Sequence, residues 1–147
     1  MHVETEITIP ASLETVYAVA KDIERFPEFF PDVESVTILE HTDTGFISEW
    51  VGIIEKLNRK LTWRELDEWD DAAHVCRFRA VGGDWDQYEG VWTFTARDGG
   101  TYMHMALECD INVPLIGALI KNLIAKLARI NVEHMFEGIR RRALGEI

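Results

Sequence analysis

The longest regular pattern in this chain runs from Asn112 to Gly145 and predicts one long α-helix. Apolar side chains recur there at intervals of three and four in two rows, at Leu115, Leu119, Leu123, Leu127 and Ile130 and at Ile116, Ile120, Ile124 and Ala128. These intervals place both rows along one side of a helix, with a polar stripe opposite. At about 1.5 Å per residue, the helix would be roughly 45 Å long. So wide an apolar side needs an extended layer of structure to cover it.

Both ends of this helix carry start and stop signals. Asn112 can cap the first turn, and Pro114 suits a position where the backbone N–H has no helical partner. Arginines at positions 140 to 142 favour the negative end of the helix dipole, and Gly145 suits a helix stop. We therefore expect the helix to occupy residues 112–145.

The middle of the chain, from Val33 to Ile111, has the composition of β-strands. β-Branched and aromatic residues dominate it, and turn signals recur about every ten residues. This spacing is typical of antiparallel strands joined by hairpins. We place these strands near residues 33–41, 46–55, 59–69, 74–81, 86–96 and 101–111.

The residues before this region predict one more strand and two short helices. Val3–Ile9 alternates like a half-buried strand, Ser12 can cap a helix, and Asp22 can cap a shorter one. The chain contains no linker and no repeat, which indicates a single domain over residues 1–147. The predicted class is α+β, with a curved antiparallel sheet of about seven strands wrapped around the long C-terminal helix.

Alternation along the later strands indicates which side chains face the helix. One side of these strands collects aromatic and sulfur-containing residues, namely Cys76, Phe78, Tyr88, Trp92, Phe94, Met103, Met105 and Cys109. In the earlier strands Trp50 alternates with Glu49, and Trp63 alternates with Arg64. The pattern therefore leaves the orientation of these four residues open.

Composition narrows the possible partners. The net charge of −11 would repel a phosphate backbone, so direct nucleic-acid binding is not expected. Polar residues interrupt the longest apolar run, 115–130, so stable membrane insertion is not expected either. Cys76 and Cys109 have no metal or redox spacing, and no secretory signal precedes the domain. These features predict a cytoplasmic location.

Two blocks of sequence resemble a known superfamily. The first, with the order Asp-Ile-x-x-Phe-Pro-x-Phe-x-Pro, comprises Asp22, Ile23, Phe26, Pro27, Phe29 and Pro31. The second comprises Gly90, Trp92 and Phe94, followed after a turn by Thr101. Both are similar to motifs of the START-like polyketide cyclase/dehydrase and lipid-transport superfamily. The chain most closely resembles its coenzyme-Q-binding subgroup.

This resemblance implies a helix-grip fold, in which the sheet and the C-terminal helix enclose a cavity for a hydrophobic ligand. Members of the superfamily bind lipids, quinones or polyketides. Some cyclise or aromatise polyketides, and some bacterial relatives act on ribosome association. The shared motifs are mostly structural, so the resemblance assigns no catalytic residue to this chain.

The candidate ligand-binding residues are large apolar side chains of the predicted sheet and helix, together with one arginine. They are Trp50, Arg64, Phe78, Trp85, Tyr88, Trp92, Met103, Met105, Leu119, Leu123, Leu127 and Met135. Each apolar candidate could instead fill an ordinary core, and Arg64 could instead face outward and pair with a carboxylate. We expect the entrance between the first turns of the helix and segments 28–30 and 82–86, with a rim shaped by Pro27, Pro31, Gly82 and Gly83.

Few side chains are candidates for chemistry. Tyr88, Glu49, Asp86 and His104 could act as an acid or a base, but only Tyr88 shares the inward face. The sequence has no metal-ligand cluster, phosphate loop or nucleophile motif, so we expect no metal and no cofactor. These features favour a protein that carries or sequesters a lipid, quinone or polyketide without catalysis. The alternatives are a polyketide cyclase or aromatase using the same cavity, and a ribosome-association modulator that acts through a protein partner.

Overall fold

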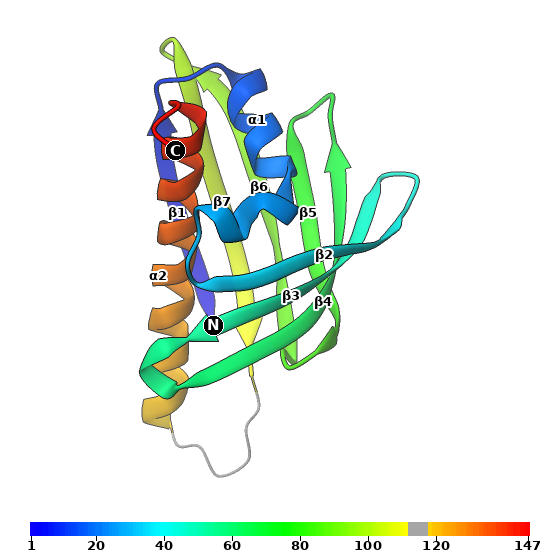
Figure 1. The fold of residues 1–147 in the computed structure, drawn as a ribbon, viewed down its shortest axis with the longest axis vertical. Helices are drawn as coiled ribbons and strands as arrows, with labels where there is room; N and C mark the ends of the chain where they lie inside the picture. The colour runs from blue at the N-terminus through cyan, green and yellow to red at the C-terminus, as the bar shows by residue number, and fades with distance from the viewer. Residues whose placement is uncertain (112–117) are drawn as a thin grey trace.

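The computed structural model describes residues 1–111 and 118–147 and confirms the α+β helix-grip architecture (Figure 1). Seven strands lie within these described residues: β1 His2–Ile9, β2 Val33–His41, β3 Gly45–Ile54, β4 Arg59–Asp70, β5 Val75–Gly83, β6 Gln87–Arg97 and β7 Gly100–Asp110. Helix α1 (Leu13–Lys21) and the 3₁₀ helix η1 (Ile23–Glu28) separate β1 from β2. The 3₁₀ turn η2 (Glu55–Leu57) joins β3 to β4, and the long helix α2 (Ala118–Ala143) follows β7.

The strands form one antiparallel sheet in the order β1-β7-β6-β5-β4-β3-β2. From β2 to β7 each strand pairs with the next one along the chain, as the hairpin spacing predicts. Strand β1 pairs instead with β7, from His2 opposite Glu108 to Ile9 opposite Thr101. Helices α1 and η1 therefore carry the chain from one edge of the sheet to the other, as Figure 1 shows.

The structure confirms the predicted cap of α1 and the predicted stop after α2. The backbone N–H of Thr15 donates to the Ser12 hydroxyl oxygen at 3.2 Å, so Ser12 caps α1 as predicted. Gly145 has a φ of 74°, the left-handed conformation of a helix stop. Asn112 and Pro114, the predicted start, lie outside the described residues. Asp22 precedes η1 but makes no capping hydrogen bond with its side chain.

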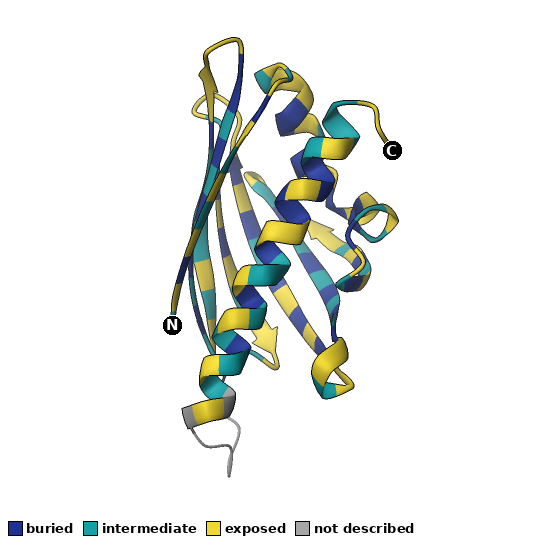
Figure 2. Cartoon of the chain, turned by 90° about the vertical axis from the view of Figure 1, so that its left-hand side faces the viewer, coloured by how far each residue is buried: buried dark blue, intermediate teal, exposed yellow. Residues whose placement is uncertain are grey.

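Helix α2 packs along one face of the sheet, and Figure 2 shows buried positions recurring down its length. Its buried hydrophobic side chains, where burial is described, are Ile124, Ala128, Val132, Met135, Phe136 and Ile139. The prediction that Leu119 faces the sheet is wrong, because this side chain is 83% exposed. The predicted apolar arc is wider than the strip that the sheet covers, and Leu119 lies on the uncovered part.

The inward face of the sheet matches the predicted alternation, and the two tryptophans left open, Trp50 and Trp63, both point inward and are buried. One end of this face, which we call the packed end, comprises Tyr17, Trp69, Trp92, Phe94 and Phe136. The Tyr17 ring meets Trp69 edge-on at a centroid distance of 5.4 Å. The Trp92 and Phe136 rings stack 6.1 Å apart. Side chains of α1 and α2 thus fill the space above the strands at this end.

Candidate functional site

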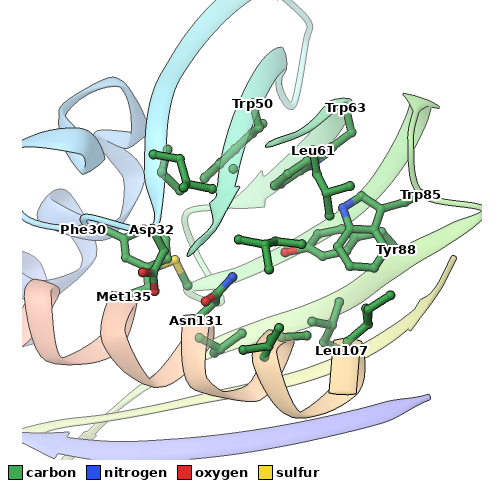
Figure 3. Close-up of a pocket in the computed structure, with 18 residues that line it drawn as sticks. Phe30, Asp32, Trp50, Leu61, Trp63, Trp85, Tyr88, Leu107, Asn131 and Met135 are labelled. Carbon is green, nitrogen blue, oxygen red and sulfur yellow. The ribbon is translucent and has the colours of Figure 1, made fainter. Parts of the chain in front are cut away.

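A cavity of about 70 Å³ lies between α2 and the sheet at the other end of the inward face (Figure 3). We call this region the cavity end and define it by its aromatic residues Trp50, Trp63, Trp85 and Tyr88. The wall that faces them comes from α2 and is mainly aliphatic or sulfur-containing, comprising Ile124, Leu127, Ala128, Val132 and Met135 together with the polar Asn131. Such an interior suits an apolar ligand with at least one ring.

Two stacked tryptophans contribute flat aromatic rings to the cavity wall. Trp50 on β3 lies directly opposite Trp63 on β4, and their rings are 5.8 Å apart with an interplanar angle of 10°. The Trp50 indole nitrogen donates to the Ser48 hydroxyl oxygen at 2.8 Å. The Trp63 indole nitrogen donates to a Glu65 carboxyl oxygen at 3.2 Å. Because both N–H groups are already bonded within the protein, this pair offers a ligand ring surface and no free donor.

Trp85 and Tyr88 provide the polar groups of the aromatic wall. The Trp85 indole nitrogen is buried and has no hydrogen-bond partner within the described part of the chain. In Figure 3 the Tyr88 hydroxyl points toward the middle of the lining residues. Burial raises the pKa of Tyr88 well above its ordinary value, and the nearby Glu65 charge raises it further. Tyr88 therefore stays an O–H donor across the physiological range.

A polar clasp of Asp32, Asn131 and His134 connects the segment before β2 to α2 beside the cavity. His134 Nδ1 lies 2.6 Å from Asp32 Oδ2. The Asn131 amide also faces this oxygen, and with its nitrogen turned toward Asp32 it donates to Oδ2 at 3.0 Å. The Ile53 N–H also donates to the Asp32 backbone carbonyl oxygen at 2.8 Å. Asp32 and Asn131 line the cavity, so the clasp holds α2 against the sheet at its wall.

The structure also contains a buried carboxyl pair that was not predicted from the sequence. Glu65 and Asp67 are only 6% and 3% exposed and share the inward face of β4 with Trp63 and Trp69. Burial raises the pKa of both groups, and the pKa of Asp67 is raised further by the Glu65 charge and a hydrogen bond to Glu65. The sequence did contain a signal for this pair, because Glu65 and Asp67 occupy the same alternate positions of the strand as Trp63 and Trp69.

The structure brings five of the twelve predicted ligand residues to the described cavity wall: Trp50, Trp85, Tyr88, Leu127 and Met135. That these side chains bind a ligand stays a prediction. Four others are buried away from the described wall, namely Phe78, Trp92, Met103 and Met105. Leu123 is half-buried outside this wall, and Leu119 is exposed.

Arg64 faces outward. Its side chain is 62% exposed, and it lies 3.6 Å from Glu49, which it faces across the β3–β4 pair. The inward orientation considered for Arg64 is therefore wrong, since Trp63 and Glu65 occupy the inward positions on either side of it. Glu49 lies opposite Arg64 on the outer face of the sheet, so it is no longer a candidate acid or base for the cavity.

Other predictions about the site have mixed outcomes. His104 pairs with Glu4 at 3.2 Å on the outer face of the sheet. Phe30 and Trp85, from the two segments expected at the entrance, lie on the cavity wall. The four predicted rim residues are not part of the wall as far as the structure describes it.

Among residues 1–111 and 118–147, no group of three or more His, Cys, Asp or Glu side chains could hold a metal ion. Within the same ranges, no helix has the length and hydropathy needed to cross a bilayer.

Comparison with known proteins places the fold and the sequence in one family. The model of the family described as polyketide cyclase / dehydrase and lipid transport matches residues 9–136. A crystal structure of TTHA0849 from Thermus thermophilus is 34% identical, with a TM-score of 0.93 and coverage of 99% of each chain. A putative polyketide cyclase of Streptomyces cyaneus is 28% identical, covering 70% of this chain and 68% of that protein. The ribosome association toxin RatA of Rickettsia prowazekii (strain Madrid E) is 23% identical, covering 92% and 90%.

Proposed function

The chain belongs to the polyketide cyclase/dehydrase and lipid transport family, and from this premise we propose that it binds a hydrophobic small molecule in the cavity between the sheet and α2. The family and the fold support a hydrophobic-ligand-binding or polyketide-cyclase-like role. The aliphatic wall of α2 and the aromatic wall of the sheet support the same role. The proposed ligand is a lipid, quinone or polyketide that contains a flat conjugated ring.

The observation that carries this proposal is the unpartnered Trp85 N–H on a largely apolar wall. A buried donor without an acceptor costs about 1–3 kcal/mol. A ligand oxygen beside Trp85 would remove that cost and could also accept from the neutral Tyr88 hydroxyl. The ring of such a ligand would lie against the stacked Trp50 and Trp63 rings. We therefore propose a ligand that carries a carbonyl or similar acceptor on its ring.

The size of the cavity means that its walls move when a ligand binds. The volume of about 70 Å³ is well below the roughly 300–1,000 Å³ of typical small-molecule sites. The polar clasp connects α2 to the segment before β2 at this wall. We expect ligand entry to open the clasp and move α2 away from β3.

The binding proposal can be tested with two probes of similar shape, 2-acetylnaphthalene and 2-ethylnaphthalene, of which only the first has a carbonyl. Titration followed by tryptophan fluorescence is expected to show tighter binding of the ketone. Trp85→Phe should weaken ketone binding about three- to tenfold, the value of one hydrogen bond, and leave binding of the hydrocarbon unchanged.

Trp69→Phe is the matched control, because the Trp69 indole nitrogen is also buried without a partner among the described residues but lies at the packed end. It should not change the preference for the ketone. The proposal fails if neither probe binds and native mass spectrometry finds the protein from its own host uniformly free of ligand.

A polyketide cyclase acting in the same cavity is a second candidate. It is favoured by the polar groups on the inward face, namely Tyr88, Glu65 and Asp67, since a fully apolar interior could not transfer protons. Incubation with a linear poly-β-ketone thioester, followed by mass spectrometry, distinguishes the two functions. A cyclase forms cyclised, dehydrated product faster than the buffer does, and Tyr88→Phe slows it. Co-sedimentation with ribosomal subunits would instead favour the activity named for the Rickettsia relative.

A further inference from the structure

We propose that Glu65 and Asp67 are positioning residues of the ligand site: as a buried pair that shares one proton, they hold the Trp63 ring in its stacked arrangement with Trp50. This inference rests on the proposed function, because it assigns these residues a role in shaping the surface that binds the ligand ring. Neither carboxyl lies on the described cavity wall, so both act through Trp63.

The geometry connects the pair to the cavity through one hydrogen bond. Trp63 lines the cavity and donates its indole N–H to Glu65 Oε1 at 3.2 Å. Asp67, which is also buried, lies two positions farther along the same inward face of β4 as Glu65. Trp50 is fixed in a similar way by Ser48, at 2.8 Å. The orientation of each stacked ring is thus set by an acceptor two positions away on its own strand.

The surroundings of Asp67 indicate where the proton is. Within the described residues, neither Glu65 nor Asp67 forms an ion pair with a lysine, arginine or histidine. Asp67 Oδ1 is buried without a hydrogen-bond partner in the same part of the chain. A neutral carboxyl tolerates such a carbonyl oxygen far better than an ionised one does. Asp67 therefore carries the proton and donates it in a hydrogen bond to the Glu65 carboxylate. Glu65 also accepts the hydrogen bond from the Trp63 indole N–H.

The groups packed around the pair leave this arrangement undisturbed. Cys76 on β5 and Tyr88 on β6 face it, and burial raises the pKa of each, so both stay neutral. The buried side of α2 is apolar. Lys21 and Glu68 also act on Cys76, more weakly than the pair does. The pKa of Asp67 is raised well above the ordinary value, in agreement with the proton assigned from its contacts.

Infrared spectroscopy and ligand titration of three variants test this inference. At neutral pH the wild-type protein should show a carboxylic-acid C=O band that disappears in Asp67→Asn, because Asn cannot carry that proton. Asp67→Asn should lose less affinity for 2-acetylnaphthalene than Glu65→Ala does, since the amide N–H₂ can donate to Glu65 in place of the acid. Glu65→Ala should lose about three- to tenfold in affinity, as expected when an oriented ring loses its hydrogen bond. Ser48→Ala, the control on the neighbouring strand, should lose affinity while keeping the infrared band.

The outcomes separate this inference from the binding proposal. If the wild-type protein binds neither naphthalene probe and native mass spectrometry finds no bound ligand, the proposed function fails. If it binds the probes but shows no acid band at neutral pH, the shared proton is wrong. If Glu65→Ala is folded by circular dichroism and binds as tightly as the wild type, the positioning role is wrong.

Discussion

The packed end and the cavity end of the inward face carry similar aromatic side chains but are filled differently. At the packed end, rings from helices meet rings from strands, as Tyr17 meets Trp69 and Phe136 meets Trp92. At the cavity end the aromatic contacts run mainly along the sheet, from Trp50 through Trp63 and Trp85 to Tyr88, with Phe26 of η1 against Trp50. Apart from Asn131, the α2 residues on the cavity wall are aliphatic or sulfur-containing.

This comparison shows that aromatic residues on the sheet do not by themselves produce a cavity. The element that covers them decides the outcome. Where α1 and the second half of α2 both cover the sheet, the space is filled. Where α2 covers it with residues as small as Ala128, space remains for a ligand. Substitutions at the two ends should therefore affect different properties, namely stability at the packed end and ligand affinity at the cavity end.

The largest expected effect is on stability at the packed end. Phe136 is only 2% exposed and stacks on Trp92, so Phe136→Ala should lower the free energy of unfolding by about 3–5 kcal/mol. Leu127→Ala, at the half-buried cavity wall, should cost less than half as much because part of its surroundings is already empty. Urea denaturation measures both values. Equal losses would contradict the distinction between the two ends.

The next effect concerns the pH dependence of stability at the boundary between the two ends. Folded Asp67 holds its proton at pH values where the unfolded chain has lost it, because its pKa is raised above the ordinary value of 3.8. The free energy of unfolding should therefore fall as pH rises above about 4, by up to about 1.4 kcal/mol per pH unit, until the folded pKa is passed. Asp67→Asn should remove this slope in urea titrations at several pH values. An unchanged slope would show that Asp67 is not the buried acid.

Filling the cavity should separate affinity from stability. Ala128 is buried on the α2 wall, and Ala128→Leu would place a larger side chain in the empty space. We expect the free energy of unfolding to change by less than about 1.5 kcal/mol. Affinity for 2-acetylnaphthalene should fall at least tenfold because the ligand and the leucine compete for one volume. Unchanged affinity in calorimetric titration would place the ligand elsewhere.

The smallest effect is expected where α1 covers the packed end. The Tyr17 hydroxyl donates to Asp71 Oδ1 at 2.6 Å, and Tyr17→Phe should lower the free energy of unfolding by about 0.5–1.5 kcal/mol. Burial and the Asp71 hydrogen bond raise the pKa of Tyr17 above its ordinary value of 10.0. Wild-type stability should therefore decline above about pH 10, where only the unfolded tyrosine ionises. In thermal unfolding, the Phe variant should show a smaller decline.

Most of the fold was predictable because it depends on local periodicity. The predicted strand 33–41 is β2 itself, and the alternation of Trp92 and Phe94 correctly indicated their inward face. Leu119 shows the limit of such patterns. A wide apolar arc is compatible with several rotations of the helix about its own axis. Contact with the sheet fixes one of them, and Leu119 then stays exposed.

The candidate site was less predictable because its polar residues depend on tertiary contacts. Glu65 and Asp67 alternate with tryptophans, yet a carboxyl is expected at the surface unless something keeps it neutral. Burial of the two carboxyls next to each other keeps the pair from ionising fully. No short stretch of sequence reveals that burial. The roles of Trp50 and Trp63 followed only from their pairing across β3 and β4.

The pairing of β1 with β7 has a consequence for the order in which this chain can fold. His2 and its partner Glu108 are 106 positions apart. Strand β1 therefore cannot pair in the sheet until β7 has been synthesised. Contacts between such distant positions slow folding, and α2 leaves the ribosome later still. Until α2 docks, the tryptophan-rich face of the sheet is open to other chains, which makes this stage the one most exposed to aggregation. If the chain binds a ligand as proposed, a ligand present during synthesis should therefore improve the yield of folded protein as well as occupy the finished site.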